Sequence, residues 1–307
     1  MAHLPQVLVF GPPTIFTQFE PQYSHKYHFL NAWASSLPLD QFLHTHNYEP
    51  SSIQAILCAG GGTPVTVHVL SVLSSVKLIV TTSAGLDHID LLECRRRGIQ
   101  VAGAGSLFSE EVAEMAVGLL IDAMRKISAA DRYVRQRVHS GPWDFPLGSK
   151  LGGKRVGIVG LGSIGFEVAK RLEAFGCSIF YNSRKEKPFI SYPFYSSVVE
   201  LAANSNALVI CCALTEQTRH IINKEVLLAL GKEGVMVNIG RGALVDEKEL
   251  VRCLIEGEIG GAGLDVFENE PHVPEELFGL DNVVLSPHAA ALLKSLPLIC
   301  VTLWQGI

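Results

Sequence analysis

One stretch, residues 154–185, constrains the fold of this chain more than any other. An apolar run at residues 156–159 is bounded by charge on one side and glycine on the other, as is typical of a buried parallel strand. After a glycine-rich turn, apolar residues recur three and four positions apart, which predicts a helix that Gly176 ends. Residues 178–181 read as a second strand. The stretch therefore predicts a complete strand–turn–helix–strand unit.

The turn of this unit carries a G-x-G-x-x-G motif. Its first glycine permits a tight turn, its second lets a pyrophosphate approach the backbone, and its third lets the helix pack close to the strand. The helix N-terminus offers free N–H groups and a positive dipole end to a phosphate. A purely structural glycine turn is the alternative, but the complete unit favours a dinucleotide site. The residues predicted to bind the dinucleotide are Gly160, Leu161, Gly162, Ser163, Ile164 and Gly165.

The end of the second strand indicates which dinucleotide is bound. NAD sites usually carry an acidic residue about 20 positions after the first glycine, where it binds the ribose hydroxyls. Residues 182–185 read Asn-Ser-Arg-Lys instead. Arg184 can make a planar, charge-assisted contact with a 2′-phosphate, with help from Ser183 and Lys185, although a solvated basic loop is the alternative. The sequence favours NADP(H), with NAD(H) less favoured.

Composition limits the other possibilities. The chain has 307 residues, enough for two domains, and a formal net charge of −5, so no nucleic-acid partner is expected. Seven cysteines are scattered without a C-x-x-C pair, which predicts no metal site and favours reduced thiols in the cytosol. No apolar run approaches the length of a membrane span, and the first residues do not resemble a targeting leader. We therefore expect a cytosolic protein without a membrane partner.

The first hundred residues alternate strands and helices, which indicates a small parallel α/β domain. Strands are expected at residues 6–10, 53–58, 78–82 and 99–102, and helices at 65–73 and 89–97, while residues 21–48 give no clear pattern. Glycine-bearing turns at 59–62 and 83–85 would lie side by side at the carboxyl edge of this sheet, where open α/β sheets bind ligands. Their backbone N–H groups can hold a carboxylate, although ordinary tight turns have the same sequence.

The alternation continues through the rest of the chain. Helices are expected at 110–124, 198–203, 224–230 and 247–256, and strands at 207–212, 235–239, 260–264 and 283–285. A polar arm at 129–146 ends in a segment with exposed aromatic residues, including Trp143. Such an arm suggests a subunit contact or a satellite cluster under a loop.

Several of the later strands end on polar residues that can do chemistry. Arg241, Asp265 and His288 each follow a strand, and Glu270 lies in the loop after the second of them. Taken singly, Arg241 suits a surface ion pair and Asp265 a helix cap. His288 alone suits a core histidine, and Glu270 an ordinary loop acid. Carboxyl ends of parallel strands share one edge, so together with a nicotinamide site they indicate a reaction centre.

This combination of motifs resembles the D-isomer-specific 2-hydroxyacid dehydrogenase family. The match covers the G-x-G-x-x-G turn, Asn-Ile-Gly-Arg-Gly at 238–242, Gly-Leu-Asp-Val-Phe-Glu-Asn-Glu-Pro at 263–271 and Ser-Pro-His at 286–288. Residues 82–90 and 182–184 make the chain most similar to the plant glyoxylate/hydroxypyruvate reductases and hydroxyphenylpyruvate reductases. The resemblance extends over nearly everything up to His288.

The resemblance implies an α/β fold of two parallel-sheet, Rossmann/flavodoxin-like domains with a cleft between them. We expect a substrate-binding domain at 1–103, an NAD(P)-binding Rossmann domain at 104–288 and a short atypical tail at 289–307. The family implies a homodimer joined through its cofactor domains. It also implies hydride transfer from NADPH to a small-molecule 2-oxo acid, which gives the D-2-hydroxy acid. Hydroxypyruvate, glyoxylate and hydroxyphenylpyruvate are the alternatives for this substrate.

The family also implies a role for each residue of the reaction centre. Arg241 would bind the substrate carboxylate, which a guanidinium matches with two parallel hydrogen bonds, and would polarise the carbonyl. His288 would be the general acid, oriented by Glu270, because hydride delivery builds negative charge on the carbonyl oxygen. Asp265 would lie near the nicotinamide amide. The remaining implied contacts are Leu214, Thr215, Ile239, Arg241 and Asp265 to the cofactor, and Ala59, Gly60, Ser83, Ala84, Gly85 and Arg241 to the substrate.

One departure from the family supports a second hypothesis. Family members usually continue past the histidine with a glycine- and threonine-containing turn and an amphipathic helix, whereas residues 289–307 are apolar and interrupted by Pro297. A truncated C-terminus of this kind leaves a non-enzymatic or weakly active NADP(H)-binding protein as the alternative, and turnover with a 2-oxo acid discriminates the two. An NAD-dependent formate or phosphoglycerate dehydrogenase is disfavoured by Arg184 and by the lack of a further regulatory domain.

Overall fold

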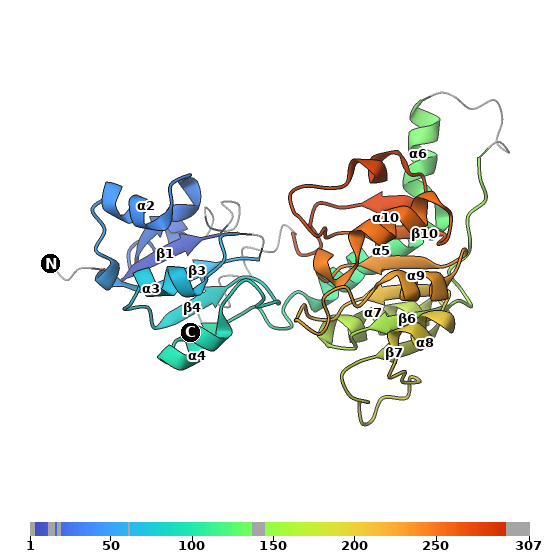
Figure 1. Ribbon diagram of the computed structural model, residues 1–307, viewed down its shortest axis with the longest axis horizontal. Coiled ribbons are helices and arrows are strands. Elements are labelled where there is room, and N and C mark those ends of the chain that lie inside the picture. Colours follow the sequence, from blue (N-terminus) through green and yellow to red (C-terminus); the bar gives the residue numbers. More distant parts are fainter. Residues whose placement is uncertain (1–3, 12–15, 17–19, 61, 137–144, 293–307) are drawn as a thin grey trace. The chain divides into compact units, whose positions relative to one another are not determined.

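The computed structural model describes residues 4–11, 16, 20–60, 62–136 and 145–292. It divides into two compact units, the first containing the chain as far as Leu107 and the second Phe108–Ala291 (Figure 1). The domain bounds expected from the sequence, 1–103 and 104–288, stay a prediction. Most of the aromatic segment around Trp143, and all of the tail from residue 293, lie outside the described residues.

The first unit is built on a five-stranded parallel sheet. Its strands, in spatial order, are β2 (His28–Asn31), β1 (Gln6–Phe10), β3 (Ile53–Cys58), β4 (Leu78–Thr81) and β5 (Gln100–Ala102). The order 2-1-3-4-5 is that of flavodoxin-like folds. The expectation of a parallel α/β unit is therefore confirmed.

Both faces of this sheet are covered, because successive side chains of a strand point to opposite sides. In β1, Leu8 and Phe10 enter one apolar cluster while Val7 and Val9 enter another. Burial on both faces explains why these strands read as continuous apolar runs. The described helices of this unit include α2 (Leu39–Thr45), α3 (Val67–Val72) and α4 (Leu91–Arg97).

Two elements of the first unit occupy the region that gave no clear sequence pattern. Strand β2 has only four residues, of which Phe29 and Leu30 are buried, and helix α2 has seven residues and no side-chain cap. Helices this short are marginal without tertiary packing, and here Phe42 and Leu43 of α2 pack into the same cluster as Leu30. Contacts distant in sequence therefore decide these elements.

The second unit is built on a six-stranded parallel sheet. Its strands, in spatial order, are β11 (Val283–Leu285), β10 (Gly261–Leu264), β9 (Val235–Asn238), β8 (Ala207–Ile210), β6 (Arg155–Val159) and β7 (Ser178–Asn182). The chain leaves β6 for β7 on one side and then returns to β8 on the other. This reversal beside β6 is the switch point at which doubly wound sheets bind ligands. The Rossmann-type prediction is confirmed.

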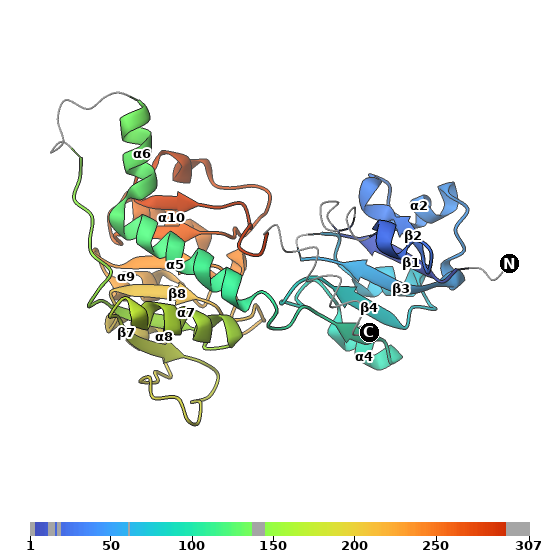
Figure 2. The ribbon, with the colours of Figure 1, turned by 180° about the vertical axis from the view of Figure 1, so that it is seen from behind.

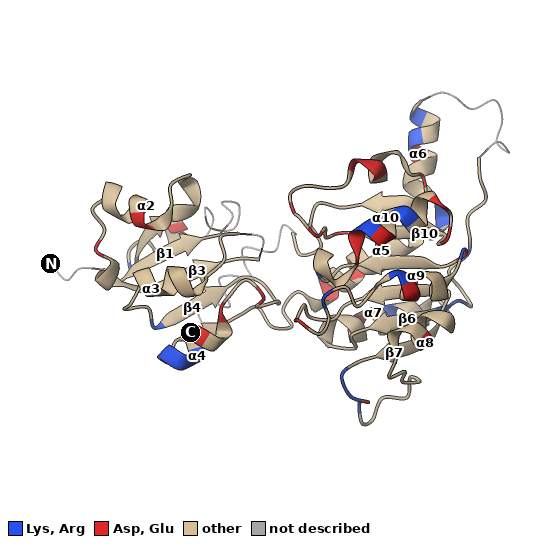
Figure 3. Cartoon of the chain, in the orientation of Figure 1, with Lys and Arg blue, Asp and Glu red and all other residues tan. Residues whose placement is uncertain are grey.

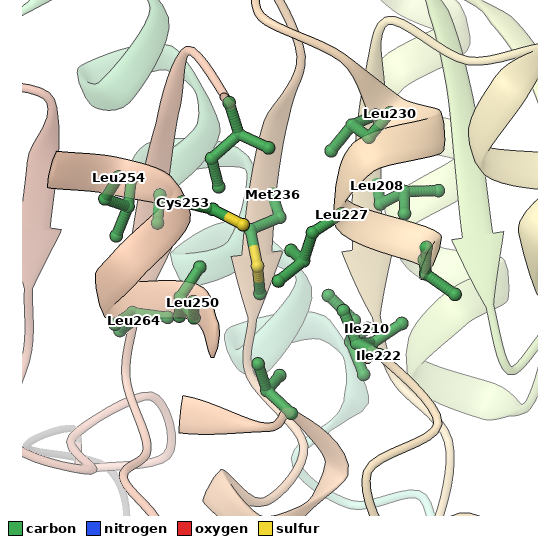
Figure 4. Packing of buried hydrophobic residues seen from close by; sticks show 14 of the residues in the cluster. Leu208, Ile210, Ile222, Leu227, Leu230, Met236, Leu250, Cys253, Leu254 and Leu264 are labelled. Atoms are coloured by element: carbon green, nitrogen blue, oxygen red, sulfur yellow. The ribbon is translucent and has the colours of Figure 1, made fainter. Parts of the chain in front are cut away.

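Helices cover both faces of the second sheet (Figures 1 and 2). Helices α5 (Ser109–Arg125) and α7 (Ser163–Ala174) pack together on one face, and α8 (Val198–Ala203), α9 (Lys224–Leu230) and α10 (Glu247–Ile255) lie on the other. Figure 4 shows the packing on the face covered by α8, α9 and α10, where Leu227 and Leu250 contact Met236 of β9. This packing fixes the strand ends that carry the site.

The remaining helices are short or peripheral. They are α6 (Ile127–Arg135) and the 3-10 helices η1 (Ala32–Ala34), η2 (Pro50–Ser52), η3 (Gly242–Leu244) and η4 (Glu275–Gly279). Among the helices of the described residues, none combines the length and the apolar character that crossing a membrane requires.

Candidate active site

The cofactor and catalytic residues expected in the second unit follow strand ends at one edge of its sheet. Gly160 follows β6, Arg184 follows β7, Arg241 follows β9, Asp265 follows β10 and His288 follows β11. Because all six strands are parallel, these ends meet at the carboxyl edge, where such sheets bind ligands. Residues spread over more than a hundred positions of sequence thus share one edge.

The three motif glycines have different structural reasons. Gly160 has φ +96°, and a Cβ there would lie 2.5 Å from the backbone of Cys212. Both the backbone conformation and the close contact therefore require glycine at this position of the turn after β6. A Cβ on Gly165 would lie 2.3 Å from the Gly160 carbonyl oxygen, which sets how closely α7 packs. A Cβ on Gly162 would meet nothing within 4 Å. The first and third glycines therefore serve packing, and the second leaves the backbone open to a ligand.

The N-terminus of α7 is suited to an anion. Gly162 is its N-cap and makes no side-chain hydrogen bond to the helix, and the first turn contains no acidic residue. The N–H groups of that turn therefore keep their capacity to donate, and no carboxylate offsets the positive end of the helix dipole. These features fit the pyrophosphate of a dinucleotide.

The end of β7 separates a structural residue from exposed basic ones. The buried Asn182 amide nitrogen donates to the Tyr195 and Ser196 carbonyls at 2.8 and 3.2 Å, and the Asn182 carbonyl accepts from the Gly160 N–H at 2.9 Å. Arg184 and Lys185 are exposed, and Figure 3 marks basic residues on the loop that follows β7. In the described part of the chain, no carboxylate forms an ion pair with Arg184. Its guanidinium thus keeps its donors for a phosphate.

The expected reaction centre has a histidine paired with a carboxylate. Nδ1 of His288 lies 2.8 Å from Oε2 of Glu270, and the other Glu270 oxygen accepts from the Phe267 N–H at 3.0 Å. The His288 and Glu270 side chains are 36% and 28% exposed, so the ring remains reachable from outside. With Nδ1 directed at the carboxylate, Nε2 is the ring atom that can exchange a proton with a substrate.

Opposing effects act on the pKa of Glu270. Burial, the largest effect, raises the pKa, but hydrogen bonds from His288 and the Phe267 N–H, with the positive charges of His288 and Arg241, outweigh it. The pKa of Glu270 is therefore below its usual range, and the carboxylate stays ionised. Glu247 differs, because burial and the charges of Glu268 and Glu270 raise its pKa.

Arg241 is held by the backbone around it. The Asn238 side chain accepts from the Gly240 N–H at 3.1 Å and donates to the Arg241 carbonyl at 2.9 Å. A Cβ on Gly242 would lie 1.9 Å from the carbonyl carbon of Phe267, so this position admits only glycine. The close approach brings the Arg241 segment against the turn that carries Glu270.

Asp265 is buried, with 1% of its surface exposed. Its carboxylate accepts from the Ser286 hydroxyl at 2.6 Å and from the Ala289 and Ala290 N–H groups at 2.9 and 3.1 Å. Its backbone carbonyl accepts from the His288 N–H at 2.7 Å. The residue that the resemblance places beside the nicotinamide thus also holds the His288 turn.

The other expected cofactor residues lie at the same edge. Leu214 packs against the apolar cluster of the second unit, and Thr215 forms a tight turn with Thr218, whose hydroxyl accepts from the Thr215 N–H at 2.7 Å. Ile239 is 6% exposed and extends β9. Their contacts with a cofactor stay a prediction.

Apart from Arg241, the expected substrate residues lie in the first unit. The turns after β3 and β4 are neighbours, since the Gly60 N–H donates to the Ser83 hydroxyl at 2.5 Å. The Ser83 N–H donates in turn to the Thr81 hydroxyl at 3.2 Å. Two of the N–H groups expected to hold a carboxylate therefore have partners within this unit. The contribution of Ala59, Ala84 and Gly85 stays a prediction.

Sequence reasoning missed a network around Glu268. Its carboxylate oxygen Oε1 binds Arg219 at 2.7 Å and His220 at 2.8 Å, while its N–H donates to Glu247 at 3.0 Å. These contacts tie the turn that bears Glu270 to the 219–220 loop and to α10. The 263–271 motif contained Glu268, but only the fold identifies its partners. Among the described residues, no group of three or more His, Cys, Asp or Glu side chains is placed to hold a metal ion.

The fold and this site together define a class of protein. The model of the D-isomer specific 2-hydroxyacid dehydrogenase family, NAD binding domain, matches residues 117–290, which is more than half of the chain. The chain therefore belongs to the D-isomer specific 2-hydroxyacid dehydrogenase family. The family expected from the sequence motifs is confirmed.

Particular relatives narrow the comparison. The chain is 55% identical over 290 residues to glyoxylate/hydroxypyruvate reductase HPR3 of Arabidopsis thaliana, covering 93% of this chain and 87% of the relative. It is 48% identical over 246 residues to hydroxyphenylpyruvate reductase of Plectranthus scutellarioides, covering 79% of this chain and 77% of the relative.

A solved structure is also similar. The NADPH-dependent glyoxylate/hydroxypyruvate reductase of Sinorhizobium meliloti, in complex with NADP and malonate, has a TM-score of 0.84 and 33% identity. The comparison covers 97% of this chain and 90% of that one. Two parallel-sheet domains of Rossmann type are therefore common to this chain and to the solved relatives.

Proposed function

We propose that this protein reduces a small 2-oxo acid, hydroxypyruvate or glyoxylate, to the D-2-hydroxy acid with NADPH. The observation that carries the proposal is the His288–Glu270 pair, with Nδ1 and Oε2 2.8 Å apart, on the sheet edge that also bears Arg241 and the glycine turn. The relatives named above as reductases of glyoxylate and hydroxypyruvate support the substrate class.

The proposed cofactor fits the residues present. The open backbone at Gly162 and the N-terminus of α7 would hold the pyrophosphate, and Arg184, Ser183 and Lys185 would hold the 2′-phosphate. Leu161, Ser163, Ile164, Leu214, Thr215 and Ile239 complete the proposed cofactor contacts. When bound, NADPH supplies the hydride that reduces the carbonyl carbon.

His288 provides the proton in the proposed reaction. Glu270 accepts from Nδ1 and fixes the orientation of the ring, which leaves Nε2 to donate a proton to the carbonyl oxygen as negative charge develops there. The ring then regains its proton from solvent, to which 36% of its side chain is exposed. The carboxylate of Glu270 stays ionised through the cycle because its pKa is low, so it stabilises the imidazolium form.

Arg241 orients the substrate. A guanidinium and a carboxylate form two parallel hydrogen bonds, which fix the plane of a 2-oxo acid and stabilise charge on the carbonyl oxygen. The Asn238 and Gly242 contacts hold the Arg241 backbone where this is required. We also propose that Ala59, Gly60, Ser83, Ala84 and Gly85 of the first unit contact the substrate. Since the N–H groups of Gly60 and Ser83 donate to hydroxyls of that unit, these two N–H groups are not counted among the proposed donors.

The alternative is a protein that binds NADP(H) with little or no turnover. The described reaction centre favours an enzyme, since Arg241, Glu270 and His288 are all present and Glu270 and His288 are paired. We further propose a substrate-binding domain at 1–103, a cofactor domain at 104–288 and a tail at 289–307, in a homodimer that resides in the cytosol.

The test is NADPH oxidation by the purified protein with hydroxypyruvate, glyoxylate and hydroxyphenylpyruvate, with NADH run in parallel. We expect rapid loss of NADPH absorbance with hydroxypyruvate and glyoxylate, and at least tenfold lower kcat/KM with NADH, as the loss of phosphate contacts predicts. NADPH binding without oxidation of any 2-oxo acid would overturn the reductase proposal and favour the binding protein. Faster turnover of hydroxyphenylpyruvate would reassign the substrate.

A further inference from the structure

The backbone of His288 has an unusual conformation. Its φ is +54°, in the left-handed region that residues other than glycine rarely adopt. A conformation of this kind persists only where the surrounding contacts determine it. The His288 N–H donates to the Asp265 carbonyl at 2.7 Å and to the Ser286 carbonyl at 3.1 Å, which accounts for part of the constraint.

The Asp265 carboxylate adds a second constraint. Its oxygen Oδ1 accepts from the Ser286 hydroxyl at 2.6 Å and from the Ala289 N–H at 2.9 Å, and Oδ2 accepts from the Ala290 N–H at 3.1 Å. These donors come from both sides of His288 in the sequence. The carboxylate therefore closes the turn around the histidine.

This carboxylate depends on its neutral donors. It is 99% buried, and in the described residues no lysine or arginine forms an ion pair with it. A buried charge is tolerated only where hydrogen bonds replace water, and hydrogen bonds to charged groups are the strongest of their kind. The Ser286 hydroxyl is the only side-chain donor to Asp265 that the described residues supply. Its loss would leave the Asp265 charge on two backbone N–H groups.

We propose that Ser286 is a positioning residue for the reduction, because its bond to Asp265 locks the 286–290 turn and holds His288 against Glu270. This inference rests on the proposed function for its catalytic consequence. The family resemblance relates Asp265 to the cofactor and assigns nothing to Ser286. The Ser286 hydroxyl acts on the reacting atoms only through the turn.

The first test compares Ser286→Ala with two matched variants. Ser286→Thr keeps the hydroxyl. Ser205→Ala removes the hydroxyl of a buried serine in the same unit, whose bond to the Leu201 carbonyl at 2.7 Å lies away from the site. We expect Ser286→Ala to lower kcat about tenfold, with the NADPH dissociation constant within about twofold, since small displacements of a catalytic group are costly. Ser286→Thr should recover most of the rate, and Ser205→Ala should retain it.

The pH profile separates positioning from general destabilisation. The low pKa of Glu270 depends on the bond from His288, on Arg241 and on the Phe267 N–H, and is opposed by burial. A loosened turn weakens the His288 contribution, so the acid limb of the kcat profile should move to higher pH in Ser286→Ala. A variant that only unfolds more easily would lose rate without moving this limb. An unchanged kcat and an unchanged acid limb would overturn the proposal.

A second measurement does not depend on turnover. In the unaltered protein, exchange of the Ala289 and Ala290 amide hydrogens should be at least tenfold slower than in a free chain, and Ser286→Ala should accelerate it about tenfold. Exchange at the free-chain rate in the unaltered protein overturns the proposal that the Ser286–Asp265 bond locks the 286–290 turn, even where a variant fails to fold. Slow exchange with no NADPH oxidation by any 2-oxo acid supports the locked turn and rejects the proposed function instead.

Discussion

Two strand ends at the carboxyl edge of the second unit, those of β6 and β11, are built on opposite principles. At the end of β6, the lack of side chains leaves room for the proposed ligand. Gly162 leaves the backbone open, and Gly160 and Gly165 permit close packing. At the end of β11, hydrogen bonds fix His288. Its ring pairs with Glu270, and the turn that carries it is bonded to Asp265. Binding a long anion needs exposed backbone donors, whereas proton transfer needs one ring held in one orientation.

The largest expected effect breaks the β11 end alone. Replacing His288 with glutamine removes the proposed proton donor, and we expect kcat for hydroxypyruvate to fall about a thousandfold, since general acid catalysis contributes about a hundredfold to ten-thousandfold. The NADPH dissociation constant, measured by fluorescence titration, should stay within about twofold. The exposed His272 supplies the control, because His272→Gln should retain full activity. A His288→Gln variant with more than a tenth of the wild-type kcat contradicts the assignment.

The next effect breaks the β6 end alone. Gly165→Ala places a Cβ 2.3 Å from the Gly160 carbonyl oxygen, so α7 must shift, and we expect NADPH affinity to fall about a hundredfold. Gly162→Ala meets no protein atom within 4 Å, so it should leave the melting temperature unchanged and weaken NADPH binding only. Calorimetry and NADPH titration of both variants check this contrast. Equal losses of stability in the two would show that the glycines do not have separate roles.

A smaller effect is expected at the end of β7, where Arg184 lies. Arg184→Ala removes the exposed guanidinium proposed to bind the 2′-phosphate, and charge-assisted contacts of this kind are worth about 1.5–3 kcal/mol. The ratio of kcat/KM for NADPH to that for NADH should therefore fall by about tenfold or more, through KM for NADPH. Arg155→Ala, which lies at the start of β6, is the matched control. An unchanged ratio in Arg184→Ala would reject the role of Arg184.

The smallest effect concerns stability at the β11 end. The pKa of Glu270 is lowered in the folded protein, so its contribution to stability is present above the ordinary pKa of a glutamate and is lost as the pH falls through the folded value. Glu270→Gln should therefore cost about 1 kcal/mol near neutral pH, the typical value of one hydrogen bond, and less in acid. Thermal unfolding of both proteins across pH measures the difference. A gap that widens toward low pH contradicts the sign.

Local sequence was sufficient for the β6 end. The strand, turn and helix are contiguous, and Gly160 and Gly165 have the turn and packing roles that their spacing indicates, while the contact of Gly162 with a pyrophosphate stays a prediction. The absence of an acidic residue at 182–185 was equally local. Short elements held by distant packing were not predictable, as β2 and α2 show, since their few buried residues gain stability only inside the assembled core.

The sequence by itself determined the parallel α/β class, the glycine turn and the residue types of the proposed reaction centre, because period, spacing and chemistry are properties of contiguous residues. Only the tertiary structure decided that Ser286 and Asp265 close the turn around His288, that Gly242 brings the Arg241 segment against Phe267, and that Glu268 binds Arg219 and His220. The physical reason is that hydrogen bonds and close approaches join residues through space. Strand order β11-β10-β9 sets those neighbours, and no local pattern records it.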